Sequence, residues 1–141
     1  MAHFLYITWL ARQAFSGLLY SWPISLILIA GLIVTAIIES PFLGSQFRRK
    51  HLLVFAPFLI CLLILVWGDV MEHPSGSQSL GPAWAGYFTL GLFAFQCLIG
   101  IYTIYLMKGF RWISTFIILL QLWFGFWCAF VAAMSISGDW L

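Results

Sequence analysis

Charged side chains are scarce in this sequence, since lysine, arginine, aspartate and glutamate together make up 7% of its 141 residues. Ordinary soluble domains carry about 25% charged residues. Hydrophobic residues account for 64% of the chain, and a soluble domain of this size still exposes roughly a third of its chain's surface to water. So few charges cannot cover that area. We therefore predict an integral membrane protein.

Sequence motifs that announce catalysis are missing as well. The chain contains no P-loop, no GxSxG sequence and no HExxH sequence. The cysteines Cys61, Cys97 and Cys128 stand singly inside apolar runs, without a CxxC pair. A membrane thiol oxidoreductase needs paired and accessible cysteines, so this class is disfavoured. We expect no enzymatic activity.

Histidine and basic residues are too few, and in the wrong places, for two further functions. His3, His51 and His73 lie outside the apolar runs or at their edges, whereas a transmembrane haem needs histidines within facing helices. The basic residues cluster in two short loops instead of forming a stripe, which argues against nucleic-acid binding. We expect no resident cofactor, although bound lipid is expected.

Long apolar segments are what the sequence does contain. Each is close to the roughly 20 residues that a helix needs to cross a bilayer. They cover residues 22–38, 52–70, 83–107 and 112–134. The turn between the last two is so short that these helices must run antiparallel. We predict a single all-α transmembrane domain over residues 1–141, with four spans arranged as two antiparallel hairpins.

The first twenty residues differ from these segments because polar or small residues interrupt them at helical spacing. Thr8, Arg12, Ser16 and Tyr20 recur at every fourth position. This pattern predicts an amphipathic helix over residues 2–20 that lies at the membrane interface, and Ser21 to Pro23 should break it from the first span. As a fifth span it would place Arg12 near mid-bilayer, at a cost of roughly 2.5–3.5 kcal/mol.

The basic residues predict the orientation. Five of the six fall in the two loops that four spans place on one side: Arg48, Arg49, Lys50, Lys108 and Arg111. The positive-inside rule makes this side cytoplasmic and puts both termini outside. No cleavable signal pattern is visible at the start. We expect a multi-pass protein of a bacterial cytoplasmic membrane, whose basic loops can also meet anionic lipid headgroups.

Small and polar residues form rows along three of the four predicted spans. Helices in lipid associate through close packing at small residues and through polar hydrogen bonds, so these rows predict helix-packing surfaces. Their members are Gly31, Thr35, Gln96, Gly100, Thr103, Gln121, Gly125, Ala129 and Ala133. Contact of Gln121 with a ligand is the alternative for the last helix.

Few side chains offer other chemistry. Asp69, Glu72 and His73 are the one group of metal-type ligands, but a zinc site needs three or four ligands and this group stands at a predicted helix end. Glu39 is the acid nearest to a span, and a salt-bridged interfacial position fits it better than proton coupling. Trp123 and Trp127 share a helix face, where packing is a simpler explanation than a quinone or pigment contact.

Three functions follow from this sequence. The favoured one is a non-catalytic accessory, structural or assembly subunit, which packs against other membrane proteins or copies of itself. The first alternative is an oligomeric pore or membrane-perturbing effector, with Gln96, Thr103 and Gln121 along its path. A weaker alternative is a small-solute carrier or membrane enzyme that uses Asp69, Glu72 and His73.

Overall fold

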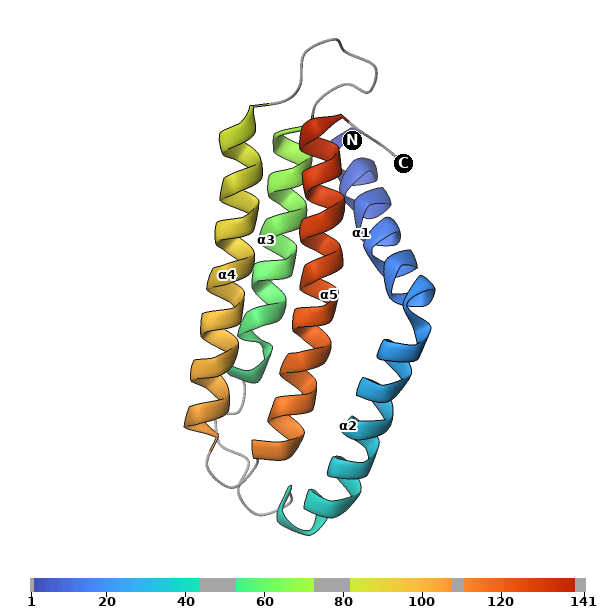
Figure 1. Ribbon diagram of the computed structural model, residues 1–141, viewed down its shortest axis with the longest axis vertical. Coiled ribbons are helices and arrows are strands. Elements are labelled where there is room, and N and C mark those ends of the chain that lie inside the picture. Colours follow the sequence, from blue (N-terminus) through green and yellow to red (C-terminus); the bar gives the residue numbers. More distant parts are fainter. Residues whose placement is uncertain (1, 44–52, 73–81, 108–110, 139–141) are drawn as a thin grey trace.

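A computed structural model describes residues 2–43, 53–72, 82–107 and 111–138, and within these ranges the chain is helical without strands. Side chains are described for residues 5–38 of the first range and for all of the others. The helices run in the order α1 (Ala2–Tyr20), α2 (Trp22–Leu43), α3 (Ala56–Val70), α4 (Ala83–Leu106) and α5 (Arg111–Ser137). The last four coincide with the predicted spans to within a few residues at most ends (Figure 1).

Helix α5 is the centre of the bundle, because it contacts each of the other four helices. α3 and α4 also contact each other, so these two helices and α5 form a compact three-helix unit. Its core contains Ile60, Ile64 and Leu65 of α3, which pack against Cys128 and Ala132 of α5. The N-terminal pair α1 and α2 runs along the other side of α5 (Figure 1).

The chain bends by 86° between α1 and α2. Pro23 has no N–H to continue the helical ladder, so carbonyl groups of the preceding turn lose a donor. Two hydroxyl groups add donors nearby: Ser21 Oγ donates at 2.8 Å to the carbonyl of Gly17, which also accepts the Ser21 N–H, and Ser25 Oγ donates to the carbonyl of Leu18 at 3.0 Å. Polar backbone groups in a lipid environment must be satisfied within the protein. The two serine hydroxyls therefore satisfy part of the backbone at the bend within the protein.

Helix α1 packs lengthwise against the bundle and does not lie across its end, which differs from the expected interfacial helix. Leu10 and Ala14 are fully buried in the core shared with α3 and α5. The Tyr6 hydroxyl lies 3.0 Å from Ser135 Oγ near the end of α5, and Gly17 faces Trp127 deeper along the same helix. The position of α1 is thus determined by the small and apolar residues on one of its sides, and the polar row lies on the other side.

Of the two predicted hairpins, the described part of the structure contains the second but not the first. α4 and α5 pack as expected, but no contact joins the described parts of α2 and α3. The 86° bend directs α2 along α5, where Phe116 fills the space over Gly31. Helices α2 and α3 are therefore consecutive in the sequence, but their described residues do not pack against each other as a hairpin.

Three helices of the structure are long and apolar enough to cross a membrane, covering Leu53–Val70, Ala83–Leu106 and Arg111–Ser137. The count rises to four if the bent pair α1 and α2 is one broken span. This composition indicates a multi-pass membrane protein. The N-terminal end of α1 and the C-terminal end of α5 lie together at one end of the bundle, called the terminal end below (Figure 1).

Candidate functional site

A buried amide links the three helices of the compact unit. Gln96 of α4 is fully buried, and its Nε2 donates to the backbone carbonyl of Gln121 at 3.1 Å and contacts Cys61 Sγ at 3.2 Å. Gly125 makes this approach possible, because a Cβ atom at that position would overlap the Gln96 amide. Hydrogen bonding across close-packed small residues is how helices hold together in lipid.

Most of the predicted packing residues therefore lie inside the chain. Gly100, Thr103, Gln121, Gly125 and Ala129 are buried, and Thr35 of α2 is buried as well. Gly31 is half-buried against Phe116. Ala133 is exposed. The rows read from the sequence thus serve contacts within one chain, with Ala133 as the member that still faces outward.

Polar side chains also meet at the terminal end. Ser135 Oγ donates to the carbonyl oxygen of Gly68 at 2.9 Å, so its single proton is used there and the Tyr6 hydroxyl donates to Ser135. Asp69 is buried next to this pair, and both Asp69 and Glu72 interact electrostatically with Tyr6. The network ties α1, α3 and α5 together.

The metal candidates do not form a ligand set in the part of the chain that the structure describes. Asp69 is 4% exposed, whereas Glu72 is exposed. His73 lies outside the described residues, and so do the side chains of His3 and Glu39. No group of three potential ligands occurs within the described ranges.

The basic-loop prediction falls mostly outside the described residues. Arg48, Arg49, Lys50 and Lys108 belong to the ranges that are left out, as does His51. Arg111 is exposed at the first residue of α5, at the opposite end of the bundle from Ser135.

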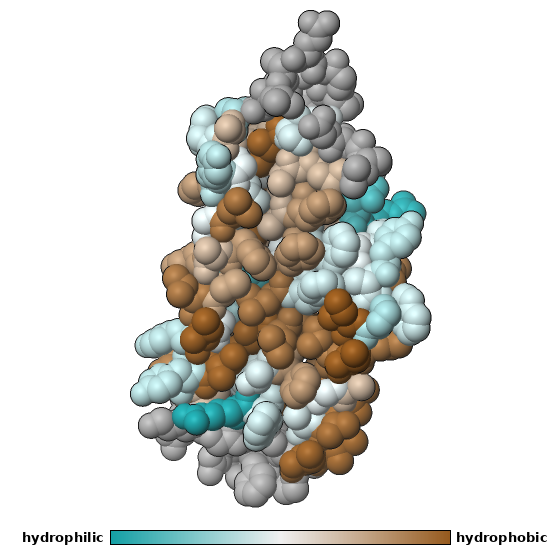
Figure 2. All heavy atoms as spheres, in the orientation of Figure 1, coloured by the Kyte–Doolittle hydropathy of each residue, from teal (hydrophilic) through white to brown (hydrophobic). Residues whose placement is uncertain are grey.

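Helix α1 presents its polar side outward. Arg12 and Gln13 are exposed, while Thr8 and Ser16 direct their hydroxyls to carbonyls of their own helix at 2.7 and 3.0 Å. Figure 2 shows hydrophilic surface at the edge of the molecule where α1 lies, beside a broad hydrophobic face. Arg12 stands between the levels of Tyr6, which meets Ser135, and Gly17, which meets Trp127.

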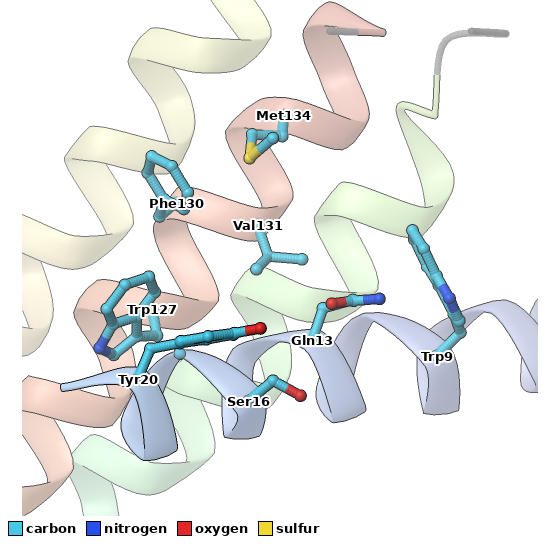
Figure 3. A pocket seen from close by; sticks show the side chains of 9 residues that line it. Trp9, Gln13, Ser16, Tyr20, Trp127, Phe130, Val131 and Met134 are labelled. Carbon is cyan, nitrogen blue, oxygen red and sulfur yellow. The ribbon is translucent and has the colours of Figure 1, made fainter. Parts of the chain in front are cut away.

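A groove of about 380 Å³ follows this face, between α1 and α5 (Figure 3). On the α1 side, the polar residues Gln13 and Ser16 lie between the aromatic rings of Trp9 and Tyr20. Its lining includes Trp9, Gln13, Ser16 and Tyr20 from α1 and Trp127, Phe130 and Met134 from α5. The indole Nε1 of Trp127 is buried without a hydrogen-bond partner among the described residues. One side of the Trp127 ring packs against Gly17, as the packing explanation requires. The same ring also borders the open groove.

Sequence reasoning missed this groove because it treated residues 2–20 and the last helix separately. The signal was present in part. Gly17 is the one glycine of α1, and Trp127 with Trp123 stood out on α5. A large ring on one helix and a glycine on another indicate close contact, but the sequence alone does not pair them.

Comparisons with known proteins add no relative: no family model, no curated protein and no solved structure matches this chain.

Proposed function

We propose that this chain is a non-catalytic accessory, structural or assembly subunit of a larger membrane complex or homo-oligomer, and that the outward face of α1 is its contact surface. The observation that carries the proposal is Arg12, which is exposed on a helix packed lengthwise against an apolar bundle. A partner that supplies an acid or a polar side chain at this level would satisfy the guanidinium.

The cost of exposing an arginine that has no acidic partner among the described residues supports this assignment. Ionisable residues within membrane segments nearly always face a protein interior, pair with one another or mark a functional surface. Arg12 lies on the same turn of α1 as Gln13 and one turn from Ser16, so the exposed face contains several polar groups together. An assembly interface removes these groups from lipid at once.

The groove beside Arg12 supports a protein partner by its shape. Interfaces concentrate aromatic residues and methionine at their centres, and this groove has Trp127, Phe130 and Met134 along one wall. The opposite wall supplies Gln13 and the Tyr20 ring (Figure 3). A side chain from a neighbouring helix would meet apolar contacts and hydrogen-bonding groups together.

The pore alternative has less support. Gln96 makes its hydrogen bonds inside the chain, and Thr103 donates to the carbonyl of Ile99 at 2.8 Å on its own helix. Both side chains are buried. Residues that the monomer uses for its own packing are poorly placed to line a path between copies.

The proposed location is a bacterial cytoplasmic membrane with both termini on the outer side. The predicted positive-inside orientation supports it, because Arg111 lies at the end of the bundle opposite the terminal end.

A photoreactive residue at the contact face tests the proposal. p-Benzoylphenylalanine in place of Gln13 should crosslink to a protein neighbour on irradiation of intact membranes. The matched control is the same residue in place of Leu98, whose side chain is exposed on α4. A dimer-sized adduct from position 13 means a homo-oligomer, and another mass means a different subunit. Lipid adducts alone at both positions would contradict the proposal.

A further inference from the structure

A second cavity of about 530 Å³ opens inside the bend of α1 and α2, between this pair, α3 and α5. It occupies the region where the expected contact of α2 with α3 is missing. Nearly all of its surface is apolar, with Ser25 and Gln121 as the polar members of its lining. The other lining residues are Phe15, Leu18, Leu19, Ile29, Phe58, Leu120 and Phe124. Its volume is within the range of small-molecule pockets.

Gln121 is the unusual member of this lining. Its side chain is 9% exposed, and its Oε1 has no hydrogen-bond partner among the described residues. The neighbouring buried amide of Gln96 is bonded through its Nε2 to the Gln121 carbonyl and to Cys61. Its Oε1 also has no partner among the described residues, but Gln96 does not line the cavity, whereas Gln121 does. Buried polar groups are almost always hydrogen-bonded, and leaving one without a partner in an apolar surrounding is costly. Because an amide oxygen only accepts hydrogen bonds, the unpartnered Oε1 of Gln121 in the lining of this cavity points to a donor that the described part of the chain does not supply.

The position of Gln121 along α5 limits what this group can be. α5 has 27 residues and begins at Arg111, so Gln121 lies roughly 15 Å along the helix at about 1.5 Å per residue. That distance is about half of a hydrocarbon core roughly 30 Å thick. Phospholipid headgroups and ester groups stay at the interface. A ligand for this amide must therefore bring its polar group into the apolar layer, and it must be uncharged.

The wall opposite the bend is flat. Phe58 of α3 and Phe124 of α5 stack with ring centroids 6.1 Å apart and an interplanar angle of 19°. Ser25 uses its proton on the Leu18 carbonyl, which leaves its oxygen as an acceptor. The cavity thus combines an aromatic wall with one amide that both donates and accepts hydrogen bonds.

We propose that this cavity binds a neutral, membrane-soluble molecule whose hydroxyl group donates a hydrogen bond to Oε1 of Gln121. The apolar body of the ligand lies against Phe58, Phe124 and the inner side of the bent helix pair. Long-chain alcohols and isoprenoid quinols share this chemistry, and they differ in whether a flat ring carries the hydroxyl group.

Photolabelling of the full-length protein in nanodiscs tests the site. The probes are an alkyl alcohol and an isoprenoid quinol kept under reducing conditions, each carrying a diazirine and an alkyne, and peptide mass spectrometry locates the label. We expect labelling of α3 and α5 around the cavity, competed by the unlabelled compound. The probe that is retained identifies the source. Even labelling of all lipid-facing helices, without competition, would overturn the proposal.

Three variants make the result specific. Gln121→Leu keeps the size of the side chain and removes the hydrogen bond, so binding should weaken about fivefold to tenfold. Leu120→Trp should fill the cavity and abolish the labelling even if Gln121→Leu fails to fold. Thr115→Val removes a hydroxyl of α5 that is bonded to the Arg111 carbonyl outside the cavity, and it should leave the labelling unchanged. Labelling that is unaffected by both cavity variants, or reproduced by a photoreactive phospholipid, would contradict the assignment.

Discussion

Gln96 donates its side-chain amide to the backbone carbonyl of Gln121 at 3.1 Å, which joins α4 to α5 within the buried core. The approach depends on the missing side chain of Gly125, because a Cβ atom there would overlap the Gln96 amide. The contact combines the two features of helix association in lipid, a polar hydrogen bond and a small residue opposite it.

Gly125→Ala should consequently destabilise the bundle by about 1–3 kcal/mol, the usual cost of overpacking a close contact. Unfolding of the purified protein by increasing SDS in mixed micelles measures the change. Gly91→Ala is the matched control on α4, because no atom lies within 4 Å of a Cβ at that position. In a Gln96→Ala background the Gly125→Ala substitution should cost less. Equal costs in both backgrounds would refute the contact.

Gly17→Ala should detach α1 from the centre of the bundle. An added Cβ would overlap the indole ring of Trp127, and this ring has little freedom beside Phe130 and Phe126. Thiol labelling of a Leu10→Cys variant reports detachment, since Leu10 is fully buried. We expect faster labelling when Gly17→Ala is added. Gly86→Ala, which meets no neighbour within 4 Å, should leave the labelling rate unchanged.

The terminal-end network predicts a graded pair of effects. Ser135→Ala removes the hydrogen bonds to Gly68 and to Tyr6, whereas Tyr6→Phe removes only the second. Interhelical hydrogen bonds in membrane proteins contribute about 0.6 kcal/mol on average. Ser135→Ala should thus lower the free energy of unfolding by about 1 kcal/mol and Tyr6→Phe by about half of that. A Tyr6→Phe effect larger than that of Ser135→Ala would contradict this hydrogen-bond assignment.

The helices themselves were predictable because lipid imposes a simple rule on length and composition. Apolar runs of about 20 residues, closed by polar loops or prolines, identify α3, α4 and α5 without knowledge of their neighbours. Ser21 to Pro23 likewise predicted the break before α2. These features are local: each depends only on residues that are close together in the sequence, so it can be recognised without knowing the fold.

The arrangement around α5 was not predictable from the same signals. The polar row of Thr8, Arg12 and Ser16 indicated an interfacial helix, but the buried side of α1 depends on which residues of α3 and α5 face it. The spacing of Leu10 and Ala14 in the sequence does not indicate which residues of α3 and α5 they contact. The two cavities arise from the same tertiary arrangement, since one follows the crossing of α1 and α5 and the other lies inside the bend.

Substitutions at Arg12 separate charge from shape at the proposed contact face. Arg12→Leu removes the charge on an exposed position, so it should release the partner while the monomer keeps its fold. Arg12→Lys keeps the charge and should retain the partner in part, because the planar guanidinium makes bonds that an ammonium group does not. Thr8→Val on the same face is the control, since the Thr8 hydroxyl is already bonded to the Leu5 carbonyl.

The size of the particle that this chain occupies tests the account most directly. Blue-native electrophoresis of gently solubilised membranes should place the wild-type chain, 16.0 kDa by itself, in a distinctly larger species. Arg12→Leu should shift it toward the monomer and Thr8→Val should not. Migration of the wild-type chain as a single monomer, identical to that of Arg12→Leu, would contradict a role as an assembly subunit.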